Sequence, residues 1–143
     1  MNVKVEQLRV SKLRDYLIEV VKKIENNSKI NVDALPKDTN SYSLDKIPTS
    51  SIVKIWINGW EIHRDVFSFR SRRNYSFSEI NNLLNIGFFE KFEQIIYKNN
   101  KNNILPDIQG IEEIKCLNCG TLNSAETGTA QFDIQIQITY LIN

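Results

Sequence analysis

The hydrophobic positions of the first fifty residues indicate one helix followed by short extended segments. Between about Val5 or Ser11 and Lys23, apolar residues recur at helical spacing and charged residues fill the other face, which predicts an amphipathic helix. Alternating residues then predict short strands at residues 30–34 and 42–44, with a polar loop between them. The stripe expected to face the core consists of Leu13, Leu17, Val20 and Ile24.

The middle of the chain predicts a β-hairpin. Two runs rich in β-branched and aromatic residues, Ser51–Ile57 and Trp60–Phe69, are joined by Asn58-Gly59. Both central residues of a two-residue type I′ turn need a positive φ, and Asn-Gly is the pair that tolerates this best. Side-chain alternation then assigns residues to the inner face of a sheet, and these are Val53, Ile55, Ile57, Phe67 and Phe69.

Helical spacing returns after the basic stretch that ends at Arg73. Ser76 and Glu79 have capping-box spacing, and an apolar stripe of Ile80, Leu83 and Leu84 follows them. Gly87 is expected to end this helix in a left-handed cap. A second helix, which contains Phe88, Phe89, Phe92, Ile95 and Ile96, is expected to follow and to end in the polar run of residues 99–103.

Two strands are predicted near the end of the chain. The first covers Ile111 to Asn118, and the second covers Ala130 to Tyr140 with the cleanest alternation in the sequence. Residues 120–128 between them are expected to form a polar loop. Because the strands are grouped in hairpins and do not alternate with helices, residues 1–143 predict a single α+β domain. Its mainly antiparallel sheet should pack against the N-terminal helix and the central helical segment.

Composition narrows the class of protein but does not identify a function. The chain has 143 residues, 41% of them hydrophobic, and a net charge of +1, so there is no overall attraction to nucleic acid or membranes. No stretch approaches the length of a membrane span, and no apolar secretion segment follows Met1. The two cysteines are therefore expected to be thiols in a reducing cytosol.

The residues capable of chemistry do not form a catalytic pattern. Cys116 and Cys119 form a CxxC motif, but a structural zinc site needs four ligands, and the chain has one histidine, His63. No nucleophile motif accompanies His63, which is expected to be a surface strand residue. We therefore expect no enzymatic activity, no cofactor and no metal, with a zinc site between subunits as the remaining alternative for the two thiols.

The segment from Arg64 to Arg73 allows two interpretations. Basic residues alternate there with Phe67 and Phe69, a combination that single-stranded nucleic-acid-binding proteins use. The same alternation also fits a strand with phenylalanines inside and arginines outside. The second interpretation is favoured by parity, and the alternatives are a nucleic-acid-binding module and a contact with an acidic protein partner.

Several stretches, taken in order, resemble one protein family. They are Tyr42-Ser-Leu44, Pro48, Asn58-Gly59, Phe67-Ser-Phe-Arg-Ser-Arg72, Gly87-Phe88-Phe89-Glu90-Lys91-Phe92, Leu105-Pro106 and Ala130–Tyr140. In this order the chain resembles the small minor capsid proteins of tailed phages of low-GC Gram-positive bacteria, which are similar to tail terminators. The resemblance covers about residues 1–143 and is firmest over 42–140. The cysteine pair is not a feature of that family, and Ile95-Ile96 stands where many members have a tryptophan.

The resemblance implies a structural protein of the virion tail, assembled in the host cytoplasm. Tail terminators have an α+β fold and form a ring, usually of six copies, on the end of the tail tube. The ring stops tube growth and joins the head connector, and DNA passes through it without specific binding. Implied partners are therefore further copies of the chain, the major tail tube protein and a head-completion protein, with no membrane. The alternative within phages is a head-completion or connector protein.

Assembly contacts are expected in the basic segment and in the loop before the last strand. The basic segment follows a long strand, so a rigid scaffold would position it, and polar loops of small residues often carry contacts. We expect the arginines to pair with carboxylates at subunit or tube contacts and not to line the ring's hole. The candidate interface residues are Arg70, Arg72, Arg73, Asn123, Ser124 and Glu126.

Overall fold

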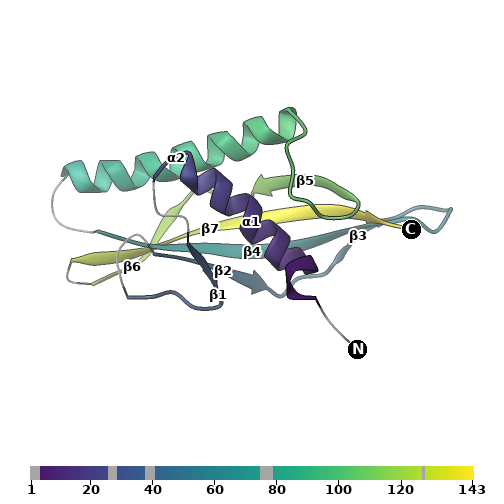
Figure 1. Cartoon of the computed structure of the whole chain (residues 1–143), viewed down its shortest axis with the longest axis horizontal. Helices are drawn as coiled ribbons and strands as arrows, with labels where there is room; N and C mark the ends of the chain where they lie inside the picture. The colour runs from purple at the N-terminus through teal and green to yellow at the C-terminus, as the bar shows by residue number, and fades with distance from the viewer. Residues whose placement is uncertain (1–3, 26–28, 38–40, 75–78, 127) are drawn as a thin grey trace.

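The computed structural model describes residues 4–25, 29–37, 41–74, 79–126 and 128–143 and contains two α-helices and a seven-stranded sheet (Figure 1). A 3-10 turn at Val5–Gln7 precedes the first helix. The helices are α1 (Arg9–Lys22) and α2 (Glu79–Lys101). The strands are β1 (Ile30–Val32), β2 (Ser41–Ile47), β3 (Ile52–Ile55), β4 (Glu61–Asn74), β5 (Ile111–Cys116), β6 (Thr121–Glu126) and β7 (Thr129–Ile142).

Two long antiparallel strands form the centre of the sheet. β4 and β7 have 14 residues each and pair along their whole length, from Glu61 opposite Ile142 to Asn74 opposite Thr129. The strand order is β1-β2-β4-β7-β5, while β3 pairs with the remaining part of β4 and β6 with the remaining part of β7. Only the β1–β2 pair among these is parallel. The predicted α+β domain with a mainly antiparallel sheet is confirmed.

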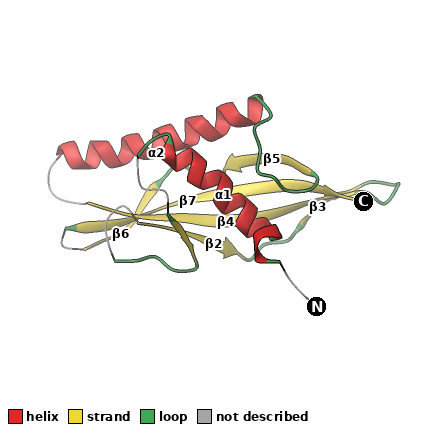
Figure 2. Ribbon diagram, viewed as in Figure 1, coloured by secondary structure: helices red, strands yellow, loops and turns green. Residues whose placement is uncertain are grey.

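The core lies between the sheet and both helices, which contribute to one buried cluster (Figure 2). Alternation along β4 and β7 buries the side chains that face the helices, as the sequence predicts for these two strands. The α1 stripe is also confirmed, with Leu13, Leu17 and Val20 buried and Ile24 packed at the cluster's margin. The inward strand residues include Phe67, Phe69, Phe132, Ile134, Ile136 and Ile138.

The central helical segment differs from the prediction, because α2 is one continuous helix that passes through Gly87. Gly87 does not have a positive φ, and a glycine inside a helix costs only about 1 kcal/mol relative to alanine. The aromatic side chains that follow Gly87 compensate for this cost, since they pack on the sheet as one face of the helix. Ser76 of the predicted capping box lies outside the described residues.

The apolar stripe predicted at the start of this helix differs as well, at the two of its residues whose side chains are described, since that of Ile80 lies outside the described part. Leu83 and Leu84 are exposed, whereas Asn85 is buried together with Phe88 and Phe89. Asn85 can occupy an inward position because its amide donates to the backbone oxygen of Asn74 at 2.8 Å. A buried asparagine whose hydrogen bonds are satisfied therefore displaces the expected leucines from the core.

The β3–β4 hairpin forms as predicted, but its turn and its burial differ. The amide of Trp56 donates to the carbonyl of Trp60 at 2.8 Å, which leaves a three-residue loop of Ile57, Asn58 and Gly59. Gly59 has a φ of 90°, whereas Asn58 does not have a positive φ, so the loop is not a type I′ turn. The hairpin extends beyond the helices at one end of the molecule (Figure 1). Val53, Ile55 and Ile57 are consequently exposed and do not belong to the inner face.

Candidate assembly surface

Two of the candidate arginines lie on the sheet face opposite the helices. Arg70 and Arg72 alternate with the buried Phe69 and Ser71 along β4, so their side chains point away from the core. The ion pair that Arg70 forms joins it to Asp45 of β2. Arg72 donates from Nε to the carbonyl of Pro36 at 2.8 Å. Both guanidinium groups are therefore half-buried and held by neighbouring segments of the same chain.

A row of charges crosses this uncovered face. Arg70 lies opposite Asp133 in the β4–β7 pairing and is also paired with Asp45, so one cation lies between two carboxylates. Burial raises the pKa of the Asp133 carboxyl, and the charge of Asp45 acts in the same direction, whereas Arg70 and the Gln131 amide act against it. Three glutamines and two threonines occupy other outward positions of β7. The face is therefore polar without a surplus of positive charge.

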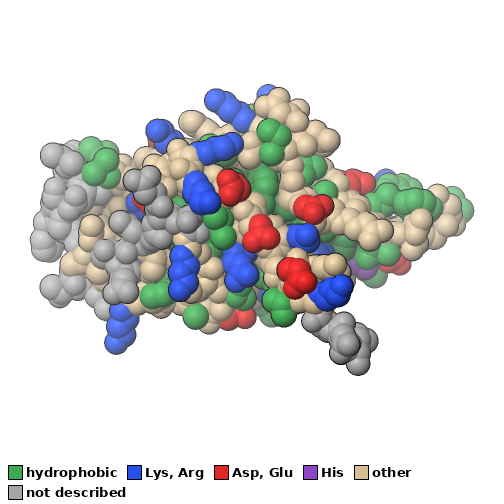
Figure 3. All heavy atoms as spheres, in the orientation of Figure 1, with side chains coloured by type: hydrophobic (Ala, Val, Ile, Leu, Met, Phe, Trp, Pro, Cys, Tyr) green, Lys and Arg blue, Asp and Glu red, His purple; other side chains and the backbone are tan. Residues whose placement is uncertain are grey.

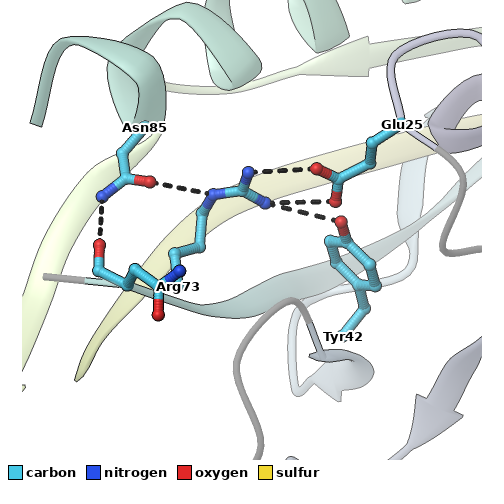
Figure 4. A network of polar contacts seen from close by, with 5 residues as sticks. Glu25, Tyr42, Arg73 and Asn85 are labelled. Carbon is cyan, nitrogen blue, oxygen red and sulfur yellow. Dashed lines mark hydrogen bonds and ion pairs between the residues drawn. The ribbon is translucent and has the colours of Figure 1, made fainter. Parts of the chain in front are cut away.

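Arg73 lies inside the protein, contrary to its predicted place at a surface (Figure 4). Its side chain points toward the helices, and the residue is only 7% exposed. The guanidinium forms two bonds to the Glu25 carboxylate, at 3.1 and 3.3 Å, donates to Asn85 Oδ1 at 3.2 Å and stacks 4.1 Å from the Phe88 ring. Arg73 pairs with a carboxylate as predicted, but within one chain. It leaves almost no surface for a neighbouring subunit, so we do not retain it as an interface residue.

The segment expected as a polar loop contains a strand. β6 forms a hairpin with the start of β7, with Ser124 opposite Gln131 and Glu126 opposite Thr129. Backbone hydrogen bonds define a strand and do not require alternating apolar side chains, so a strand exposed on both faces has no pattern in the sequence. Asn123 and Ser124 are exposed on this edge strand, and the side chain of Glu126 lies outside the described part. Two candidate residues thus occupy a polar sheet edge.

A strongly apolar surface includes three residues that the sequence pattern assigned to the core, Val53, Ile55 and Ile57. Residues 52–60 of the β3–β4 hairpin form a protrusion, which we call the apolar arm, and Figure 3 shows it covered by hydrophobic side chains. Its large exposed side chains are Ile52, Val53, Ile55, Trp56, Ile57 and Trp60. Alternation alone could not reveal this surface, because the same pattern is typical of a strand buried by a helix. What distinguishes the arm is that it lies beyond both α1 and α2 (Figure 1).

A cleft of about 720 Å³ opens at the base of the arm. Trp60 and Tyr140 line it together with the charged side chains of Arg9, Lys12 and Asp107. Lys12 lies 3.3 Å from Asp107, and Arg9 lies 2.7 Å from the buried Asp65. These charges are neutralised inside the chain, so the cleft does not present the convergent polar groups of a small-molecule site.

His63 and the two thiols do not assemble into a reactive site. His63 is partly buried and not a plain surface residue, since its Nε2 lies 2.7 Å from Glu61 and its ring tilts against Tyr140. Burial, together with the charge of Glu93, raises the pKa of the Cys116 thiol to about 12, which disfavours the reactive thiolate. Cys119 is an exposed free thiol. Among the described residues, no group of three or more potential metal ligands converges.

Comparisons with known proteins do not assign this chain to a family. No protein-family model and no curated protein sequence matches this chain. In the part of the chain that the structure describes, no helix combines the length and the apolar composition needed to cross a membrane.

Proposed function

We propose that this chain is the subunit of a phage tail terminator, a ring that caps the tail tube. The observation that carries the proposal is the architecture of the surface. A rigid sheet has helices on one side only, a polar open face on the other and an apolar arm that extends past the core. Monomeric proteins rarely expose so many large apolar side chains together, and such surfaces are typical of assembly contacts.

The resemblance described above supports the same function from an independent direction. It implies an α+β fold in which helices flank a sheet, and the chain has this architecture. The resemblance is carried by several ordered stretches, and these include Asn58-Gly59 in the arm and Ala130–Tyr140 in the central strand β7. The proposed partners are further copies of the chain, the major tail tube protein and a head-completion protein.

The arginines of β4 support a ring that DNA traverses more than a module that holds nucleic acid. Unpaired cationic side chains are the source of affinity for phosphates. Arg64 donates to the carbonyl of Ser50 at 2.9 Å, Arg70 pairs with Asp45, and Arg73 pairs with Glu25. Arg70 and Arg73 are thus neutralised by carboxylates of the same chain, which reduces their attraction for passing DNA, whereas Arg64 keeps its net charge.

The test is a tube-growth assay with the major tail tube protein of the same phage. That protein is allowed to polymerise with and without the purified chain, and tube lengths are measured by negative-stain electron microscopy. A terminator should shorten the tubes in proportion to its concentration. Unchanged lengths, together with binding to an isolated head connector, would instead favour the head-completion alternative.

The polar edge strand gives a sharper form of this assay. Asn123→Asp and Ser124→Asp place two new negative charges on exposed residues of β6, and circular dichroism checks the fold because Asn123 hydrogen-bonds to Asp133. If β6 lies at a contact, the double variant should cap tubes less efficiently than the parent. The matched control is Glu112→Gln with Glu113→Gln, which changes two exposed side chains on β5. Equal capping by all three proteins would remove β6 from the interface.

A further inference from the structure

The apolar arm is large enough to form the centre of a stable interface. Its six large side chains include Val53, Ile55 and Ile57, which are 52%, 62% and fully exposed. Together the six present on the order of 600 Å² of apolar surface, since large side chains carry about 150–250 Å² each. A typical specific interface buries about 800 Å² on each partner. Lys54 is the arm's single charged residue, so the partner surface should be apolar as well.

A second exposed apolar surface lies on α2. Leu83, Leu84 and Ile86 are 58%, 65% and 53% exposed and lie on the side of the helix opposite Phe88 and Phe89. We call these three residues the α2 patch. Gly87 lies among them, and the space beside its Cα is open, since a Cβ built there meets no atom within 4 Å. A protruding side chain of a partner can therefore approach the helix backbone at Gly87, next to the leucines and the isoleucine.

The arm and the α2 patch lie at opposite ends of the elongated molecule (Figure 1). A single chain therefore cannot bring them together, but two copies can. A contact between two different surfaces of identical chains is heterologous, and repetition of such a contact closes into a ring when the rotation permits it. Two charge-poor apolar surfaces on opposite ends thus provide both halves of one interface.

We propose that the arm of one copy, led by Ile57, docks on the α2 patch of the next copy. Ile57 is the outermost apolar side chain of the three-residue loop and would pack over Gly87, between Leu83 and Leu84. The closure into a ring rests on the proposed function. The contact between two copies does not depend on it. It also explains why leucines occupy outward positions of α2 while Asn85 occupies an inward one.

A complementation experiment with two variants tests the contact. Ile57→Asp disables the arm and keeps the patch, and Leu84→Asp disables the patch and keeps the arm. The control is Ile104→Asp, a half-exposed isoleucine outside both surfaces. Circular dichroism checks that each variant folds, and analytical ultracentrifugation over a concentration series measures the mass of each protein and of the equimolar mixture.

We expect the parent and Ile104→Asp to form assemblies larger than two copies. Each of the other two variants should remain at the 16.6 kDa of a single chain. Their mixture should form a heterodimer and no larger species, because it contains one intact arm and one intact patch that can meet. A parent that stays monomeric up to its solubility limit, or variants that assemble like the parent, would overturn the proposal. So would a mixture that remains monomeric beside an assembling parent.

Cross-linking keeps the proposal testable if Leu84→Asp fails to fold. In a background with Cys116→Ser and Cys119→Ser, one protein carries Ile57→Cys and a second carries Leu84→Cys. Under mild oxidation the mixture should give a covalent heterodimer, and Ile57→Cys mixed with Ile104→Cys should give at least tenfold less. Equal yields would contradict the contact. Because no tail tube is present, failure here is distinguishable from failure to cap tubes.

Discussion

The Arg73 guanidinium on β4 lies 3.1 Å from the carboxylate of Glu25, just beyond the end of α1. A second pair joins Arg9, at the start of the same helix, to Asp65 on β4 at 2.7 Å. The sixteen residue steps from 9 to 25 correspond to about 24 Å at the helical rise, and the eight steps from 65 to 73 correspond to about 26 Å as a strand. The two ion pairs are therefore matched in spacing, and they fix α1 along β4 at both of its ends.

The buried pair of Arg73 and Glu25 predicts that substitutions of Arg73 and of its neighbour Arg72 lower the free energy of unfolding by very different amounts. Arg73→Met removes the partner of Glu25 and the hydrogen bonds to Asn85 and Tyr42, and should cost about 2–3 kcal/mol. This expected loss of stability is smaller than that for a fully buried ion pair because the side chain of Glu25 is partly exposed. Arg72→Met is the matched control and should cost about 1 kcal/mol or less. Urea unfolding measures both, and equal losses would contradict the internal role of Arg73.

The core strand β7 predicts a second contrast, between two isoleucines. Ile136 is fully buried, so Ile136→Ala removes apolar packing and should cost about 2–5 kcal/mol. Ile57 is fully exposed in the arm, so Ile57→Ala should change the unfolding free energy of the single chain by about 0.5 kcal/mol or less. Thermal and urea unfolding at low protein concentration provide the comparison. Similar losses for both variants would mean that the arm is buried within the chain.

Asp133 predicts a stability difference that depends on pH. Because burial raises the pKa of its carboxyl, the folded chain holds this proton more tightly than the unfolded chain does. The contribution of this carboxyl to the free energy of unfolding is then most favourable at low pH, and it is lost as the pH rises through the pKa of the folded state. Asp133→Asn should therefore match the parent near pH 3, a value below the usual range of an aspartate, and be more stable near pH 7. A parent that is the more stable protein at neutral pH would contradict this direction.

The two thiols should react at different rates. Burial beside Glu93 raises the pKa of Cys116 to about 12, so almost none of it is thiolate at pH 8, whereas Cys119 is exposed. Alkylation of the native protein at pH 8, followed by peptide mass spectrometry, should modify Cys119 first by a wide margin. Denaturant should remove the difference. Equal rates in the native protein would show that Cys116 is not shielded.

The sequence predicts the parts of the fold where periodicity and burial coincide. Alternation in β4 and β7 and the helical stripe around Leu17 each match one buried face, so their inner residues could be identified in advance. Periodicity reports which residues share a face and not whether anything covers that face. Val53 and Ile55 therefore carried the pattern of a core strand although they lie beyond the helices.

The candidate surface was less predictable, for reasons that particular residues make clear. Arg73 has the same charge as Arg72, and only strand parity together with the position of Glu25 distinguishes the buried residue from the half-exposed one. The β6 strand has polar residues on both faces, and its pairing with β7 depends on a long-range register that local composition does not encode. Side-chain interactions with distant segments thus decide which candidate residues remain at the surface.

The most direct test of the terminator assignment counts labelled chains on single tail tubes. The parent, labelled at Cys119 in a Cys116→Ser background, is added to preformed tubes and observed by single-molecule fluorescence with photobleaching. We predict labels at one end of each tube only, with several bleaching steps per labelled end, as a ring requires. Labels spread along the tube wall, single-step labels, or tubes without labels would contradict the account.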